Sequence, residues 1–237
     1  MTEPTVAAQP PSLISRIIGV ITSPRVTFEK IVAAPRPVGI MLVVALTIGV
    51  VQAIPLFSEQ GRQAVLTAQM EAMSRQGPVT PEVAARVEQF SRFMPIIAMV
   101  GTFIFLPVVA LFMSALYWGI FNVVLGGTAS YKQVLAIVTH AQVIGALAVL
   151  AGLPFMLSQP NLKFGGPFNL GALAPMLDET SRLAKFLGNI SIFSLWGAFV
   201  TATGLSVLYR RKMTGILIVV LGIVALMAYV GVIFSRT

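Results

Sequence analysis

Five stretches of the chain contain no Asp, Glu, Lys or Arg and are long enough to cross a lipid bilayer. They cover residues 37–58, 93–131, 133–162, 186–209 and 213–235. A helix needs about 20 apolar residues to cross about 30 Å of hydrocarbon, and a backbone in lipid must satisfy its own hydrogen bonds. We therefore predict an all-α integral membrane protein, a bundle of five transmembrane helices near residues 37–57, 93–125, 131–157, 186–209 and 213–234.

The stretch at 93–131 has room for either one long helix or two short ones folded at Pro107. Charge favours one helix, because short basic loops stay in the cytoplasm and a sixth span would move the basic cluster at 210–212 to the outer side. Five spans with a cytoplasmic N-terminus put eight cations and two acids inside, against eight cations and six acids outside. We therefore expect one long second span, kinked at Pro95 and Pro107, and a C-terminus outside the cell (inner or plasma) membrane.

Composition agrees with a membrane protein, because 57% of the residues are hydrophobic and only 10% are charged. Soluble domains have about 25% charged residues. The pI near 10.5 does not imply nucleic acid, because most cations border the membrane, where anionic lipid is the expected partner. The cations expected at the cytoplasmic membrane surface are Arg16, Arg25, Lys30, Arg36, Arg210, Arg211 and Lys212.

Two short amphipathic helices are predicted over residues 12–35, after a tail at 1–11 that we expect to be disordered. Ser23 and Pro24 suit a helix N-cap and the first helical position. On the first helix Leu13, Ile14, Ile17, Ile18 and Ile21 share one face, opposite Ser12, Ser15 and Arg16. We predict that both helices lie on the cytoplasmic membrane face with their apolar sides on lipid, where they either orient the first span or dock a partner.

The remainder of the chain, residues 36–237, is predicted to be one membrane domain with two outer segments. The segment at 58–92 should hold two helices. The segment at 159–185 is rich in Gly, Pro and Asn, so we predict a loop that packs onto the bundle, with a functional lid as the alternative. On the cytoplasmic side, Ser130 and Gln133 have the spacing of a capping box, which makes spans two and three a tight hairpin.

The residue types give little sign of catalysis. The chain has one histidine and no cysteine, and no acid lies inside a predicted span. We therefore expect no metal, no cofactor and no catalytic group. The candidate intramembrane polar site consists of Asn122, His140, Gln142 and Asn189, and Gln52 is a further polar residue in the spans. His140 should lie about 13 Å deep, so two interpretations stay open: a pore or ligand site between spans two, three and four, or a packing hydrogen bond to a neighbouring helix.

Small residues recur on one side of the third span. Ala141, Gly145, Ala148 and Gly152 are three or four positions apart, so they form a stripe along one helix face. Such a stripe permits close approach of another helix, either within the bundle or from a second copy of the chain.

Three stretches of the chain carry a family resemblance. They are "LISRIIGVITSPRVTFEKI" before the first span, "LYWGIFNVVLGGTASYKQVLAIVTHA" at the hairpin of spans two and three, and "ISIFSLWGAFVTATGLSVLYRRK" at the fourth span. Together they resemble the YIP family (Ypt-interacting proteins), most closely its bacterial five-span members. The resemblance implies a helical-bundle protein of the bacterial inner membrane without established catalytic residues. Eukaryotic relatives bind small Rab-type GTPases, but this sequence lacks their Asp-Leu-Tyr-Gly-Pro motif.

These observations favour a non-enzymatic multi-pass membrane protein that binds partner proteins or organises membrane. The alternative is a small-solute or lipid transporter with a site near His140, although the spans carry no midplane charge and no inverted repeat is evident. The expected partners are the lipid bilayer, anionic lipid at the cytoplasmic face, and a membrane-protein partner or a second copy of the chain. Nucleic acid is not expected.

Overall fold

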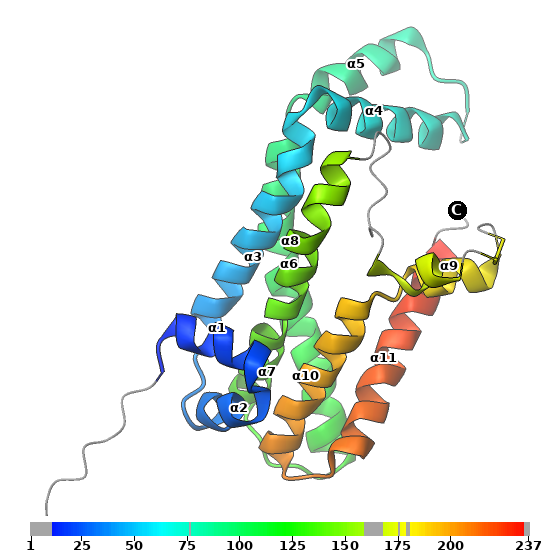
Figure 1. The fold of residues 1–237 in the computed structure, drawn as a ribbon. Helices are drawn as coiled ribbons and strands as arrows, with labels where there is room; N and C mark the ends of the chain where they lie inside the picture. The colour runs from blue at the N-terminus through cyan, green and yellow to red at the C-terminus, as the bar shows by residue number, and fades with distance from the viewer. Residues whose placement is uncertain (1–10, 76, 159–167, 175, 179–180, 235–237) are drawn as a thin grey trace, which may run out of the picture.

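The computed structural model describes residues 11–75, 77–158, 168–174, 176–178 and 181–234. The predicted tail therefore lies almost wholly outside the described residues, as does part of the predicted loop at 159–185. Within the described part of the chain, five helices are long and apolar enough to cross a membrane (Figure 1). The prediction of an all-α, five-span membrane protein is confirmed.

Four of the five spans agree with the predicted ranges to within one residue. The fourth was expected from residue 186 but begins at Ile192, because residues 186–188 belong to a separate short helix, α9 (Arg182–Gly188). The five spans are α3 (Pro37–Ala53) with the 3-10 turn Ile54–Phe57, α6 (Met94–Trp118) with the π-helical turn Gly119–Val124, α7 (Tyr131–Ala141) with α8 (Val143–Ser158), α10 (Ile192–Tyr209) and α11 (Met213–Phe234). Lipid offers the backbone no hydrogen bonds, so these boundaries fall where polar residues and turn formers return.

The second span is one helix, as charge predicted. Pro107 lies inside α6, whose helix continues through it, whereas Pro95 lies in the first turn, where its missing N–H interrupts no bond. The kink expected at Pro95 is therefore wrong. The third span, expected as one helix, runs from Tyr131 to Ser158. At Gln142, where α7 meets α8, the backbone keeps right-handed helical dihedral angles, and the Gln142 N–H still donates to the carbonyl of Val138 at 3.1 Å.

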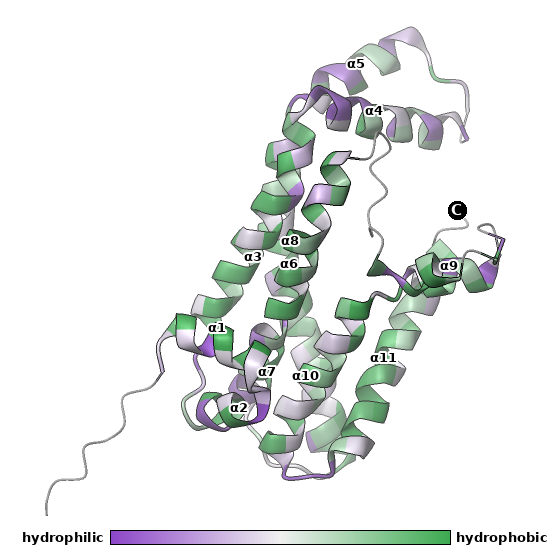
Figure 2. Ribbon diagram, viewed as in Figure 1, coloured by the Kyte–Doolittle hydropathy of each residue, from purple (hydrophilic) through white to green (hydrophobic). Residues whose placement is uncertain are grey.

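The bundle has two ends of different composition. The basic end holds α1 (Leu13–Thr22), α2 (Pro24–Ala33), the turn at 125–130 and the turn at 210–212 (Figure 1). The far end holds α4 (Glu59–Ser74), α5 (Pro81–Ser91) and α9 (Arg182–Gly188). Figure 2 shows hydrophobic residues along the spans and hydrophilic ones at α4, α5 and the turn between α10 and α11.

The N-terminal helices are packed into the bundle. Val20 of α1 and Phe28 and Ile31 of α2 are buried in the main core together with residues of α7 and α10. Ile17 and Ile21 of α1 pack against a second core, which α3 and α8 form. Helices α1 and α2 are therefore structural parts of the bundle.

This packing divides the apolar face that was predicted to rest on lipid. Ile14 and Ile18 remain 68% and 55% exposed, while Ile17 and Ile21 face protein. Arg16, predicted at the membrane surface on the polar face, is only 8% exposed. A helical wheel predicts a single apolar face for α1. In the structure α1 contacts several helices at once, so residues at the edge of that face, such as Arg16, are buried against protein.

A glycine on α10 makes room for α2. A Cβ atom at Gly204 would lie 2.5 Å from Cγ2 of Ile137 on α7 and 3.1 Å from Cδ1 of Phe28. Real Cβ contacts are essentially never as short as the first of these, so any larger residue would push α7 or Phe28 away. Gly204 thus lets α2, α7 and α10 meet with the Phe28 ring between them.

Capping residues start the helices at the turns. The hydroxyls of Ser58 and Thr80 accept from the backbone N–H groups of Gly61 and Val83 at the starts of α4 and α5. Ser130 and Gln133 form the predicted capping box at the start of α7. Each side chain replaces a hydrogen-bond partner that the first helical turn lacks.

Candidate functional site

The four polar residues of the candidate intramembrane site lie at three different levels of the bundle. Asn122 lies at the basic end, His140 and Gln142 lie where α7 meets α8, and Asn189 lies at the far end just before α10. The structure therefore brings only His140 and Gln142 close together.

Asn122 ties the hairpin of spans two and three to α10. Its Nδ2 donates to the carbonyl of Ala129 at 2.6 Å, and its Oδ1 accepts from the Tyr209 hydroxyl at 2.8 Å. The Trp118 indole N–H donates to the same carbonyl at 3.0 Å, and the rings of Tyr209 and Phe121 stack with centroids 5.1 Å apart. These contacts account for both polar groups of Asn122, so its observed role is structural.

Asn189 makes a similar hydrogen bond between two helices at the far end. Its Nδ2 donates to the carbonyl of Ala228 on α11 at 3.2 Å. The same amide lies over Gly231, where a Cβ atom would come within 2.8 Å of it. Asn189 therefore fixes the start of α10 against the end of α11.

His140 is fully buried, but it does not bond a neighbouring helix as the packing interpretation expected. Its Nδ1 lies 2.6 Å from the carbonyl of Ala136, one turn earlier in the same helix, so Nδ1 carries the proton and donates. Its Nε2 is buried and has no hydrogen-bond partner among the residues that the structure describes. The buried hydroxyl of Ser114 on α6 donates to the carbonyl of Ala110 in its own helix.

Arg16 is the second buried polar group of this region. Its Nε is cut off from solvent and has no hydrogen-bond partner, and its charge lies close enough to act electrostatically on His140. Burial, and then the positive charge of Arg36, lower the pKa of the Arg16 guanidinium below its ordinary value. The structure thus buries much of the Arg16 side chain, with no ion pair among the described residues, where the sequence predicted a solvated cation.

The other six predicted surface cations are exposed at the basic end. They are Arg25, Lys30, Arg36, Arg210, Arg211 and Lys212. Arg211 donates from Nη2 to the carbonyl of Leu125 at 2.5 Å, which joins the two turns of this end. Arg25 faces Glu29 at 3.8 Å across one helical turn, and both side chains are more than half exposed. An exposed ion pair such as Arg25 with Glu29 is weak, so Glu29 offsets little of the positive charge. The electrostatic potential at this end is therefore strongly positive.

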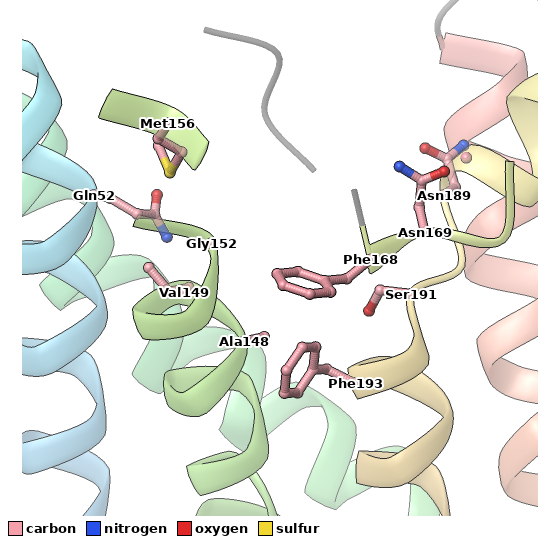
Figure 3. A pocket seen from close by; sticks show the side chains of 11 residues that line it. Gln52, Ala148, Val149, Gly152, Met156, Phe168, Asn169, Asn189, Ser191 and Phe193 are labelled. Atoms are coloured by element: carbon pink, nitrogen blue, oxygen red, sulfur yellow. The ribbon is translucent and has the colours of Figure 1, made fainter. Parts of the chain in front are cut away.

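Two cavities open between α8 and α10 toward the far end, and we call them together the α8–α10 groove. The far cavity, of about 460 Å³, lies among Gln52 of α3, Gly152 and Met156 of α8, and Phe168, Asn189 and Phe193 on the side of α10 (Figure 3). The side cavity, of about 310 Å³, lies among Tyr117 of α6, Gln142 and Gly145 of the third span, and Gly197 of α10. Ala148, Ser191 and Phe193 line both, so the cavities adjoin.

The small-residue stripe of the third span lines this groove. Ala141, Gly145 and Ala148 face the side cavity, and Ala148 and Gly152 face the far cavity. A Cβ atom at Gly145 or at Gly152 would meet nothing within 4 Å. Among the described residues, the stripe therefore leaves space beside α8, and the close approach of a helix from the same bundle, one of the two alternatives, is not found at these glycines. The approach of a second copy of the chain stays a prediction.

Aromatic rings surround the junction of the two cavities. The Phe168 ring lies edge to face on Phe155 and on Phe193, with centroids 5.5 and 5.4 Å apart, and Phe193 lies 6.3 Å from Trp196. These rings come from α8, from the segment before α9 and from α10. Phe193 and Trp196 are three positions apart on one helix, but no sequence pattern related them to Phe155 and Phe168, which belong to other segments.

Comparison with known proteins agrees with this architecture. A family model described as the Yip1 domain matches residues 18–235, which run from within α1 to the end of α11. The chain is similar to membrane protein YknW of Bacillus subtilis (strain 168), with 29% identity over 208 residues that cover 84% of this chain and 79% of that protein. No solved structure matches the chain.

Proposed function

Because the chain belongs to the Yip1 family, we propose that it is a non-enzymatic membrane protein that organises membrane around it, with a basic end that binds anionic lipid. The observation that carries the proposal is a set of seven exposed cations at that end, namely the six named above and Lys132 at the start of α7. Among the described residues of this end, Glu29 is the single carboxylate. Each Lys or Arg near an anionic membrane surface adds about 1 kcal/mol of attraction. The docked helix α2 holds two of these cations, Arg25 and Lys30, and Arg36 lies directly before α3.

The surroundings of His140 support a role without catalysis. The hydroxyls of Thr139 and Ser114 both donate to carbonyls of their own helices, so neither is placed as a nucleophile for His140. Among the described residues, no three His, Cys, Asp or Glu side chains gather in one place. A general base without a substrate group or nucleophile in reach has no evident chemistry.

Orientation follows from the same charge distribution. The basic end should face the cytoplasm, because short basic loops are retained there. With five spans, a reporter active in the cytoplasm should work when fused after Lys212, and one active outside should work when fused at Thr237. Reporter activity on the same side at both positions would contradict five spans, and a reversal of both would contradict the proposed orientation.

The lipid proposal is tested with matched triple variants. Arg25→Gln, Lys30→Gln and Lys212→Gln together should weaken phosphatidylglycerol binding to the purified full chain by up to about 100-fold, at about 1 kcal/mol per cation. Binding is measured by native mass spectrometry in a neutral detergent. The control changes three exposed far-end cations, Arg75, Arg86 and Arg92, to Gln. Equal losses in both variants would overturn a specific role for the basic end.

A transporter is the second candidate, and one observation favours it. The side cavity is lined by spans two, three and four and includes Gln142, close to His140, which is where a transport site was expected. A transporter would move lipid or solute across proteoliposomes made with the purified chain, whereas a protein that only organises membrane would not.

A further inference from the structure

The α8–α10 groove has the shape and polarity of a binding site for an amphiphile. We propose that it binds a membrane phospholipid, with one acyl chain along the side cavity and the glycerol-ester region at the far cavity. This site lies at the opposite end of the spans from the basic end, so it is separate from the anionic-lipid surface proposed above.

The first argument is space. The two cavities, about 460 and 310 Å³, share three lining residues and each lies in the size range of about 300–1,000 Å³ that is typical of ligand sites. The space exists because Gly145 and Gly152 have no side chain and no atom of the described residues lies within 4 Å of where their Cβ atoms would be. Atoms that line an unfilled space lose dispersion contacts, and acyl chains are the nearest material that restores them.

The second argument is polarity along the groove. The far cavity has polar side chains that include Gln52 of α3, and Asn189 and Ser191 of the connection between α9 and α10 (Figure 3). The side cavity is mostly apolar, with Met113 and Val138 on its walls. A phospholipid has the same order of parts, because its ester and phosphate oxygens precede its hydrocarbon chain.

The third argument is depth. Gln52 lies one residue before the end of α3, and Asn189 and Ser191 lie just before α10 begins, so all three belong to the level where spans end. The Gln52 amide reaches from α3 toward α8 and has no hydrogen bond among the described residues (Figure 3). Its NH2 group is therefore available to donate to an ester or phosphate oxygen.

The fourth argument is access from the bilayer. Helix α6 forms one wall of the side cavity through Tyr117 and Met113. Only 6% of the most apolar stretch of this span is buried inside the protein, so we expect lipid to cover its outer surface. An acyl chain therefore needs to move only sideways, past the edge of α6, to enter the groove.

The test uses the full chain in vesicles that contain a phosphatidylcholine with a photoactivatable diazirine in its acyl chain. After illumination, adducts mapped by mass spectrometry should be enriched at Gln142, Phe193 and Tyr117 relative to Leu226, which is 59% exposed on α11. Gly145→Phe with Gly152→Phe fills the groove and should reduce the groove adducts several-fold, with no change at Leu226. The matched control, Gly222→Phe, also enters open space but lies outside the groove, so its adducts should follow the unchanged chain.

A second arm separates the head-group contact from simple filling by hydrocarbon. Gln52→Leu should weaken capture of the phosphatidylcholine probe by about fivefold, the effect of one hydrogen bond, and leave capture of a diazirine alkane without a head group unchanged. Adducts at the groove no more frequent than at Leu226, or unaffected by the two phenylalanines, would overturn the site. Equal loss of both probes in Gln52→Leu would overturn the placement of the head group. Each result is independent of phosphatidylglycerol binding at the basic end.

Discussion

Replacing Phe28 by alanine should lower the free energy of unfolding by about 3–5 kcal/mol, the usual cost of deleting a buried phenyl ring. Phe28 has no exposed surface and lies in the main core of the bundle. Its ring contacts the position of Gly204 on α10 and lies close to Ile137 on α7. These neighbours belong to long helices that cannot close the space left by the ring without moving their other contacts.

The control for this prediction is Val26→Ala on the same helix, because Val26 is 55% exposed. Its effect on unfolding should be within about 0.5 kcal/mol. Both variants are compared with the unchanged chain by thermal unfolding in a mild neutral detergent. If Phe28→Ala and Val26→Ala unfold at the same temperature as the unchanged chain, α2 is a peripheral helix and its docking into the bundle is wrong.

The number of spans could be predicted from sequence because lipid imposes a simple requirement on it. Each span must be long, apolar and free of charge, and these properties are local, so Asp, Glu, Lys and Arg positions were sufficient. The capping box at Ser130 and Gln133 could also be predicted from the sequence, because both residues lie in one helical turn. The packing of α1 and α2 was not, because it depends on Gly204, which lies more than 170 residues away from them in the chain.

For the polar residues too, the hydrogen-bond partners that are distant in the chain could not be predicted from the sequence. That Asn122 and Asn189 needed partners followed from their place in or beside the spans, but their partners, Tyr209 and the Ala228 carbonyl, are 87 and 39 residues away. The small-residue stripe could be read from sequence, yet a stripe is compatible with a tight helix contact and with a groove. Only the direction of α10 relative to α8 decides between them, and this direction is a property of the whole bundle.

Arg16→Met should raise the free energy of unfolding by about 1–4 kcal/mol, the gain found when a buried ion pair or triad is replaced by apolar residues of similar volume. Arg16 is 8% exposed, its Nε has no hydrogen-bond partner, and the neighbouring charge is that of Arg36, which repels it. A guanidinium stays charged at neutral pH even when burial lowers its pKa, so the folded state holds this charge with reduced hydration. Methionine keeps the unbranched stem that packs between α1 and the bundle and removes the charge.

The matched control is Arg25→Met, which removes a charge from the exposed surface of the adjacent helix, where its pair with Glu29 is worth at most about 1 kcal/mol. Both variants are measured by thermal unfolding in neutral detergent without anionic lipid, so that no phosphate is available to pair with Arg16. A rise for Arg16→Met and little change for Arg25→Met is the expected result. A fall of about 3–5 kcal/mol for Arg16→Met, the cost of breaking a buried ion pair, would show that Arg16 has a favourable partner and that its burial is not a cost to the fold.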